Sequence, residues 1–262
     1  MELTVSLAQM DIVLGDVEAN LMRVVSFAAE ASRLGADILV LPELFTTGYD
    51  LARASQLATP DLAHGLGARL AALARQHRMW IAGSLLALDP GGRPANTAVF
   101  WSPQGQPVGV YRKIHLFRPM EEHLYLAPGD SAAVVNLPWG VSALAICYDL
   151  RFPELFRHYA LSGAGIIFVP AEWPSPRIAH WQILCRARAI ENQVVIIACN
   201  RVGSDGRNHF GGCSAIIDPA GEVLVEGDEQ EALLTARVDL SYADALRRDM
   251  AVLPDRRPEL YA

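Results

Sequence analysis

VSALAICYDLRFPE, residues 141–154, runs from a short apolar stretch through a cysteine to Pro153. The apolar residues 141–146 predict a buried strand, and Pro153 favours the first turn of a helix that continues to about residue 162. Cys147 therefore lies on a tight turn between a strand and a helix. Strands that alternate with helices in this way are typical of α/β folds.

The rest of the chain repeats this alternation in two halves. We predict further strands at residues 4–9, 38–41, 80–86, 96–101, 108–110, 166–169, 194–199, 214–217 and 223–225. We predict further helices at residues 17–34, 61–78 and 178–193. Each half ends in a hairpin, which indicates two sheets packed face to face with helices outside. No linker rich in Pro, Gly or Ser interrupts the chain, so we expect residues 1–262 to form a single domain.

Composition excludes several classes of protein. The net charge is −7, and no basic stripe of the kind that binds nucleic acid is visible. The longest apolar runs, such as residues 165–171, are too short to span a bilayer. The first residues lack the pattern of a signal peptide, so we expect a cytoplasmic location. The four cysteines show no CxxC spacing, so we expect neither a zinc site nor another metal site.

Two charged residues follow predicted strands, where α/β folds build their sites. Glu43 comes directly after four aliphatic residues and Pro42, and partial desolvation makes a carboxylate a stronger base. Lys113 follows the predicted strand 108–110, where a fixed ammonium group can stabilise an oxyanion. Taken singly, each residue has a simpler interpretation as a solvated surface charge.

Cys147 differs from the other cysteines in its surroundings. A nearby helix N-terminus and a cation would favour its thiolate form, which is the nucleophilic form. Cys185 lies within a predicted helix, Cys199 lies in an apolar run, and Cys213 lies beside two glycines. We expect these three thiols to be buried and inert.

Three segments together resemble the signature segments of the nitrilase-like carbon–nitrogen hydrolases, in the same order. They are LPELFTTGY at residues 41–49, YRKIHLF at 111–117 and CYDLRFPE at 147–154. A fourth segment, RARAIENQ at 186–193, is similar to the helix that follows the cysteine in that family. The resemblance spans roughly residues 4–239 and is closest to the bacterial amidase or ω-amidase-like branch.

The resemblance implies a four-layer αββα sandwich and a cysteine-dependent amidase that needs no cofactor. By analogy, Glu43 takes the thiol proton, Cys147 attacks the amide carbon, and a thioester forms as ammonia leaves. Lys113 and the backbone N–H of Tyr148 would hold the oxyanion, and water would then release the acid. Many members use a second glutamate. Of the two candidates Glu121 and Glu122, the distance to the PGD turn at residues 128–130 favours Glu122.

The residues that follow Cys147 narrow the range of expected substrates. CYDLRFPE is similar to the ω-amidase branch, and it lacks the Cys-Trp patterns of nitrile- and carbamoyl-cleaving members. Three further residues are expected to bind the substrate, namely Glu172, Trp173 and Arg177. Arg177 can pair with the free carboxylate of a dicarboxylic acid monoamide, although an arginine facing water is nearly as good an interpretation. The expected partner is a small amide such as 2-oxoglutaramate.

Other functions stay open from the sequence. A nitrilase or an N-carbamoyl amide hydrolase would use the same three residues. An inactive binding or assembly protein on this fold is disfavoured by the intact Glu43, Lys113 and Cys147. The resemblance also implies a homodimer or a larger homo-oligomer. The polar tail from about residue 240, which ends in RRPELY at 256–261, is a candidate for subunit contacts.

Overall fold

The computed structural model describes residues 1–260 and contains two six-stranded sheets. In the first sheet the strand order is β14-β1-β2-β3-β4-β5, and in the second it is β13-β12-β9-β8-β7-β6. The strands of the first sheet are β1 (Glu2–Gln9), β2 (Ile38–Val40), β3 (Trp80–Leu88), β4 (Pro94–Trp101), β5 (Pro107–Arg112) and β14 (Ala232–Asp239). Those of the second are β6 (Val134–Leu137), β7 (Gly140–Leu144), β8 (Ile166–Ala171), β9 (Val195–Asn200), β12 (Ala215–Ile217) and β13 (Val223–Glu226). A small ribbon pairs β10 (Val202–Ser204) with β11 (His209–Gly211).

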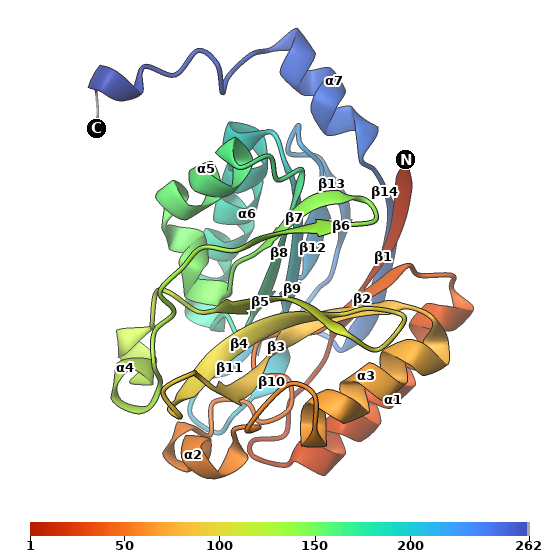
Figure 1. Ribbon diagram of the computed structural model, residues 1–262, viewed down its shortest axis with the longest axis vertical. Helices are drawn as coiled ribbons and strands as arrows, with labels where there is room; N and C mark the ends of the chain where they lie inside the picture. Colours follow the sequence, from red (N-terminus) through yellow and green to blue (C-terminus); the bar gives the residue numbers. More distant parts are fainter. Residues whose placement is uncertain (261–262) are drawn as a thin grey trace.

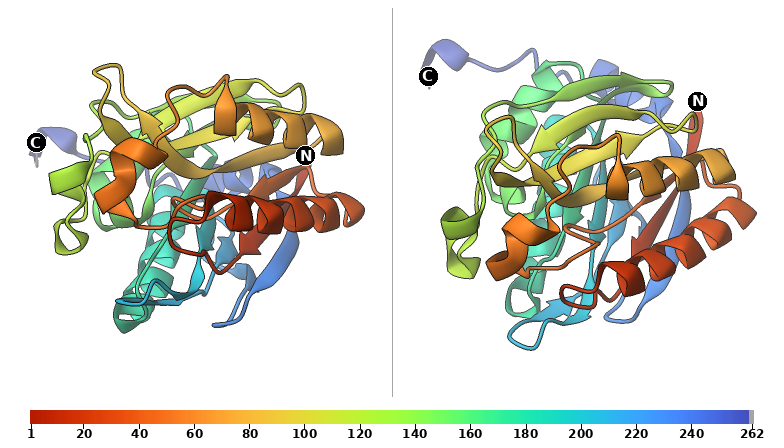
Figure 2. Two further views of the ribbon diagram at one scale, coloured as in Figure 1. Left: turned by 90° about the horizontal axis from the view of Figure 1, so that it is seen from below. Right: turned by 60° about the horizontal axis from the view of Figure 1, so that its bottom comes forward.

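Helices cover the outer face of each sheet. Those on the first sheet are α1 (Val17–Arg33) and α3 (Gly65–His77). Those on the second are α5 (Pro153–Leu161) and α6 (Ile178–Asn192). The short helices are α2 (Ala54–Leu57), α4 (Glu122–Tyr125) and α7 (Ser241–Asp249). Figures 1 and 2 show the resulting layers, and the predicted αββα sandwich is confirmed.

The core lies between the two sheets. Phe100 of β4 and Phe168 of β8 meet edge to face, with ring centroids 5.0 Å apart. The Cys199 thiol of β9 lies 3.3 Å from the carbonyl oxygen of Val40 on β2, so this cysteine is fully buried between the sheets. Parallel pairing of β1, β2 and β3, and of β7, β8 and β9, buries both faces of these strands, which explains their nearly continuous apolar sequences.

The C-terminal elements differ most from the sequence predictions. β14 pairs antiparallel with β1 along its whole length, although its sequence ALLTARVD lacks a clear strand pattern. Its strand state depends on this long-range pairing, which periodicity does not reveal. The predicted polar tail contains α7, which lies outside the main body in Figure 1. The tail's last residues, Tyr261 and Ala262, lie outside the described residues.

The predicted helix 61–78 begins later than expected, at Gly65. The carboxylate of Asp61 accepts hydrogen bonds from the backbone N–H groups of Ala63 and His64, both at 2.8 Å. This side-chain turn gives residues 61–64 a local alternative to the helical conformation, and Gly65 has a positive φ of 53°, so the helix begins only there. Over residues 1–260, no helix is both long and apolar enough to cross a membrane.

Replacing Phe168 with Ala should destabilise the protein strongly. The side chain is fully buried between the sheets, and its removal leaves a cavity at the contact with Phe100. We expect the free energy of unfolding, measured in urea, to fall by about 3–5 kcal/mol. Met22→Ala is the control, because Met22 is 67% exposed on α1 and should change stability by less than about 0.5 kcal/mol. Equal effects of the two substitutions would contradict the described core.

Candidate active site

Three loops bring the predicted catalytic residues together. Glu43 follows β2, Lys113 follows β5, and Cys147 follows β7. Glu43 and Lys113 are fully buried, and Cys147 is 4% exposed. The Lys113 Nζ atom lies 2.7 Å from Glu43 Oε1, and both Glu43 and Lys113 are close enough to the Cys147 thiol to shift its pKa. A nucleophile, a base and a cation therefore share one buried site.

Lys113 bridges two carboxyl groups. Its ammonium nitrogen lies 2.7 Å from Glu43 Oε1 and 2.7 Å from Glu122 Oε1. Burial by itself would lower the pKa of Lys113, but the negative charges of Glu122 and Glu43 outweigh burial and raise it. Lys113 is therefore charged at any physiological pH.

The structure brings Glu122, and not Glu121, to Lys113. Glu122 is fully buried, and its second carboxyl oxygen accepts a hydrogen bond from the Phe117 backbone N–H. Glu121 is exposed and takes a left-handed backbone conformation with φ of 61°. That turn points the two neighbouring side chains in different directions. Burial raises the pKa of Glu122, and the charge of Lys113 opposes this shift.

Glu43 is held by groups that the sequence did not single out. Its Oε1 atom accepts a hydrogen bond from Asn96 Nδ2 at 2.8 Å, and its Oε2 atom accepts one from the backbone N–H of Glu172 at 2.8 Å. The phenolic oxygen of Tyr49 lies 2.8 Å from Glu43 Oε1. Tyr49 stands in the quoted LPELFTTGY segment, whereas Asn96 gives no local signal.

Cys147 occupies a strained turn. Its φ is 46°, a left-handed conformation that is uncommon for residues other than glycine. Burial raises the pKa of the thiol, the charge of Glu43 raises it further, and Lys113 acts in the opposite direction. Lys113 thus favours the thiolate, as expected from the sequence, but burial and the charge of Glu43 outweigh its effect. The thiol is protonated, so attack on a substrate needs a base.

Asp149 connects the Cys147 turn to the Lys113 loop. Its Oδ2 atom accepts hydrogen bonds from Ile146 N at 2.9 Å and from the Tyr111 hydroxyl at 2.7 Å. Its Oδ1 atom accepts one from His115 N at 3.2 Å and lies 2.7 Å from His115 Nδ1. Tyr111 and His115 flank Lys113 in the chain. One buried carboxylate thus sets the position of the nucleophile relative to the cation.

A narrow cleft leads to Cys147. Its lining consists of Phe117, Cys147, Tyr148, Arg151, Trp173, Pro174 and Arg177. The predicted residues Tyr148, Trp173 and Arg177 are thus part of the cleft, with Arg177 exposed at its rim. The Arg151 guanidinium stacks over the Trp173 ring at 4.7 Å. Arg151 was not among the predicted site residues, although it lies within CYDLRFPE.

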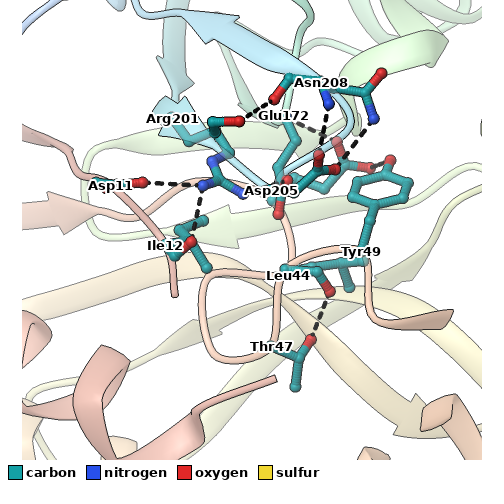
Figure 3. A network of polar contacts seen from close by, with 12 residues as sticks. Asp11, Ile12, Leu44, Thr47, Tyr49, Glu172, Arg201, Asp205 and Asn208 are labelled. Atoms are coloured by element: carbon teal, nitrogen blue, oxygen red, sulfur yellow. Dashed lines mark hydrogen bonds and ion pairs between the residues drawn. The ribbon is translucent and has the colours of Figure 1, made fainter. Parts of the chain in front are cut away.

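The Glu172 side chain is buried and is not part of the cleft lining beside Cys147. It pairs with Arg201 at 2.9 Å, and Arg201 also lies 3.0 Å from Asp11 (Figure 3). Burial raises the pKa of Glu172 to about 8, against the opposing effect of Arg201. Since Glu172 does not line the cleft beside Cys147, its placement favours support of Glu43 through the backbone instead of the substrate contact predicted from the sequence.

The described residues contain no arrangement of side chains suited to a metal ion. Within residues 1–260, no group of three or more His, Cys, Asp or Glu side chains is arranged to hold a metal ion. The four cysteines are all free thiols, so Cys147 has no disulfide partner. Its sulfur is therefore available to form a covalent bond with a substrate.

A family model of the carbon–nitrogen hydrolases matches residues 4–248, and the chain belongs to this family. It is thus a member of an enzyme family that hydrolyses carbon–nitrogen bonds. The chain is 42% identical to the 2-oxoglutaramate amidase of Bacillus subtilis strain 168 over the whole length of both proteins. It is 38% identical to the omega-amidase of Escherichia coli strain K12, over 94% of this chain and 92% of that protein.

A solved structure gives a chemical comparison. It is a mutant of the amidase from Nesterenkonia sp. AN1, in which the acetamide moiety of fluoroacetamide is covalently added at the active-site cysteine. The TM-score is 0.89 at 28% identity, over 99% of this chain and 95% of that chain.

Replacing Asp149 with Asn should remove hydrogen bonds that hold the turn at Cys147 in place. Each carboxylate oxygen of Asp149 accepts from two groups, and an amide nitrogen cannot accept, so two donors lose their acceptor in either orientation of the amide. We expect the free energy of unfolding to fall by about 2 kcal/mol. We also expect the rate at which iodoacetamide alkylates Cys147 to change.

The matched control for this substitution is Asp249→Asn, because Asp249 is exposed on α7. It should leave both the stability and the alkylation rate unchanged. If Asp149→Asn behaved like this control, Asp149 would not hold the turn.

Proposed function

We propose that this protein is an ω-amidase, which hydrolyses the terminal amide of a small dicarboxylic acid monoamide such as 2-oxoglutaramate. One observation carries the proposal: Cys147 lies at the base of a cleft that has arginines on its walls and a buried Glu43–Lys113 pair behind the thiol. The similarity to proteins named 2-oxoglutaramate amidase and omega-amidase supports the same substrate class.

The first half-reaction forms a thioester. Glu43 takes the thiol proton, and the Cys147 sulfur forms a bond to the amide carbon, whose oxygen becomes an oxyanion. The Lys113 ammonium and the backbone N–H of Tyr148 stabilise this oxyanion. The carbon–nitrogen bond then breaks, Glu43 returns its proton to the leaving nitrogen, and ammonia departs. The neutral thiol of the resting site explains why an adjacent base is needed.

The second half-reaction releases the acid. Glu43 takes a proton from water, and the hydroxide oxygen forms a bond to the thioester carbon. The carbon–sulfur bond breaks, the sulfur recovers the proton from Glu43, and the carboxylic acid leaves. The net reaction consumes one amide and one water and yields one acid and one ammonia. The hydrogen bonds from Asn96 and from the Glu172 backbone keep Glu43 in place through both steps.

The far end of the substrate is recognised by charge. Arg151 and Arg177 both line the cleft that contains Cys147. A guanidinium group binds a carboxylate through two parallel hydrogen bonds, so either arginine suits the free carboxylate of a dicarboxylic acid monoamide. The stacking of Arg151 on Trp173 gives its guanidinium a fixed orientation.

Cys147→Ala should abolish ammonia release, because no other group in the cleft can form the thioester. We expect a loss of about a thousand-fold or more in kcat with 2-oxoglutaramate as substrate. Cys213→Ala is the matched control, since Cys213 is half-buried away from the cleft, and this variant should keep wild-type activity. Full activity in folded Cys147→Ala would exclude the proposed mechanism.

The role of the arginines is tested by comparing two substrates. With Arg151→Gln or Arg177→Gln, kcat/KM for 2-oxoglutaramate should fall about ten-fold or more for the arginine that binds the carboxylate. An uncharged aliphatic amide of similar length should lose less than about three-fold. Arg33→Gln, on the exposed face of α1, is the control. Equal losses on both substrates would argue against carboxylate recognition.

We also infer that the protein acts in the cytoplasm as a homo-oligomer. The membership in the family supports self-association, and α7 with the residues after it extends away from the main body, leaving Met250 and Leu260 exposed. Exposed apolar side chains on an extended tail are suited to contact with a second subunit. Light scattering measures the subunit number, and a monomer at all concentrations would contradict the inference.

A further inference from the structure

Tyr49 lies inside the catalytic cluster, although neither half-reaction gives it a step. The turn before it is closed by hydrogen bonds from the backbone N–H groups of Thr47 and Gly48 to the carbonyl oxygen of Leu44, at 2.9 and 2.8 Å. Figure 3 shows Tyr49 beyond the turn at Leu44 and Thr47. The turn brings the Tyr49 hydroxyl within hydrogen-bond distance of Glu43, six residues earlier in the chain. Its side chain therefore approaches the carboxyl groups from the loop that also carries the base.

The phenolic oxygen of Tyr49 touches both carboxyl groups of the cluster. It lies 2.8 Å from Glu43 Oε1, 2.7 Å from Glu122 Oε1 and 3.3 Å from Lys113 Nζ. A phenol carries a single proton, so it can donate to only one carboxylate at a time. The other short contact needs a proton of its own. One of the two carboxyl groups must therefore be protonated.

The remaining hydrogen bonds indicate which carboxyl group carries that proton. Glu43 accepts from Lys113, Asn96 and the backbone N–H of Glu172, a set of donors that favours the ionised form. Apart from Tyr49, the donors to Glu122 within residues 1–260 are Lys113 and the Phe117 backbone N–H. Glu122 is the carboxyl group whose burial favours the neutral form. In this arrangement the protonated Glu122 carboxyl group donates a hydrogen bond to the Tyr49 oxygen, and the Tyr49 hydroxyl donates one to the Glu43 carboxylate.

We propose that Tyr49 is a positioning residue that links a neutral Glu122 to an ionised Glu43, so that the buried cluster holds one shared carboxyl proton. In this state the charges of Lys113 and Glu43 cancel. When Glu43 takes the thiol proton, Lys113 is left as the unbalanced positive charge beside the new oxyanion. An ionised Glu122 would neutralise Lys113 at that moment and weaken its hold on the oxyanion.

Several groups face the Tyr49 hydroxyl and take part in its electrostatics. They are Glu122, Glu43, Cys147, Glu172 and Lys113. Burial raises the pKa of Tyr49 well above its ordinary value, and the charges of Glu122 and Glu43 add to this effect. The phenol therefore stays protonated and acts as a donor and an acceptor, without becoming a phenolate.

Tyr49→Phe removes the link and keeps the ring. The cluster of Glu43, Glu122 and Lys113 loses one donor to its negative charge, so the cluster should take up a further proton at a higher pH, and activity needs an ionised base. We expect the acidic limb of the kcat/KM profile to move to higher pH by about one unit. We also expect kcat to fall about ten-fold or more while KM changes less than about two-fold. A merely structural role would lower activity without moving the acidic limb.

Tyr242→Phe is the matched control, because Tyr242 is exposed on α7, far in the chain from the cluster. It should reproduce the wild-type profile. If Tyr49→Phe folds and its acidic limb coincides with that of the wild type, the shared proton is excluded.

Infrared spectroscopy tests the same proton without relying on activity. The resting wild-type protein near neutral pH should show the carbonyl band of a buried protonated carboxyl group. This band should disappear in Glu122→Gln. It should shift in frequency in Tyr49→Phe, because the Glu122 carboxyl group then loses its hydrogen bond to the phenol. Because Glu172 is also buried with a raised pKa, Glu172→Gln is included and should leave the Glu122 band in place.

The absence of any such band in the wild type would overturn the proposal. So would the persistence in Glu122→Gln of the band that Glu172→Gln leaves in place. The activity test rests on the proposed role of Glu43 as the base, whereas the infrared test does not. A failure of the proposed function would appear as full activity in Cys147→Ala and would leave the infrared result standing. A failure of the shared proton would appear in the infrared spectra and as an unmoved acidic limb in Tyr49→Phe, while Cys147→Ala would still be inactive.

Discussion

The buried ammonium group of Lys113 is the interaction on which the site depends. Removing a charge from water costs several kcal/mol unless partners replace the lost hydration. Glu43 and Glu122 replace it, each at 2.7 Å, from the loop after β2 and from α4. This pairing ties together segments that are distant in the chain, and the layers around it exclude water. In the proposed mechanism the same buried charge stabilises the developing oxyanion.

A second buried carboxylate has a different task. Asp149 accepts backbone and side-chain donors from both the Cys147 turn and the segment around Lys113. It therefore maintains the strained backbone of Cys147, with φ of 46°, at a fixed distance from the cation. The raised pKa of the thiol, the paired lysine and the turn held by Asp149 together describe a site whose nucleophile candidate is neutral and fixed in position.

Much of the fold follows from local sequence patterns. Continuous apolar runs such as residues 38–41 and 166–169 predicted central strands, because parallel strands are buried on both faces. The patterns failed where an element depends on a distant partner. β14 is a strand because it pairs with β1, more than two hundred residues earlier, and α7 buries only Ala243. The pairing of β14 with β1 leaves no alternating pattern in the sequence of β14.

The sequence by itself determined the α/β class and the three motifs that contain Glu43, Lys113 and Cys147, because strand patterns and chemically apt residues at strand ends are local features. Only the tertiary structure decided that Glu122 and not Glu121 meets the lysine, and that Tyr49 lies between two carboxyl groups. It also decided that the thiol is neutral. These properties arise from burial and from contacts between distant segments. Desolvation and close charges shift protonation only after the chain has folded.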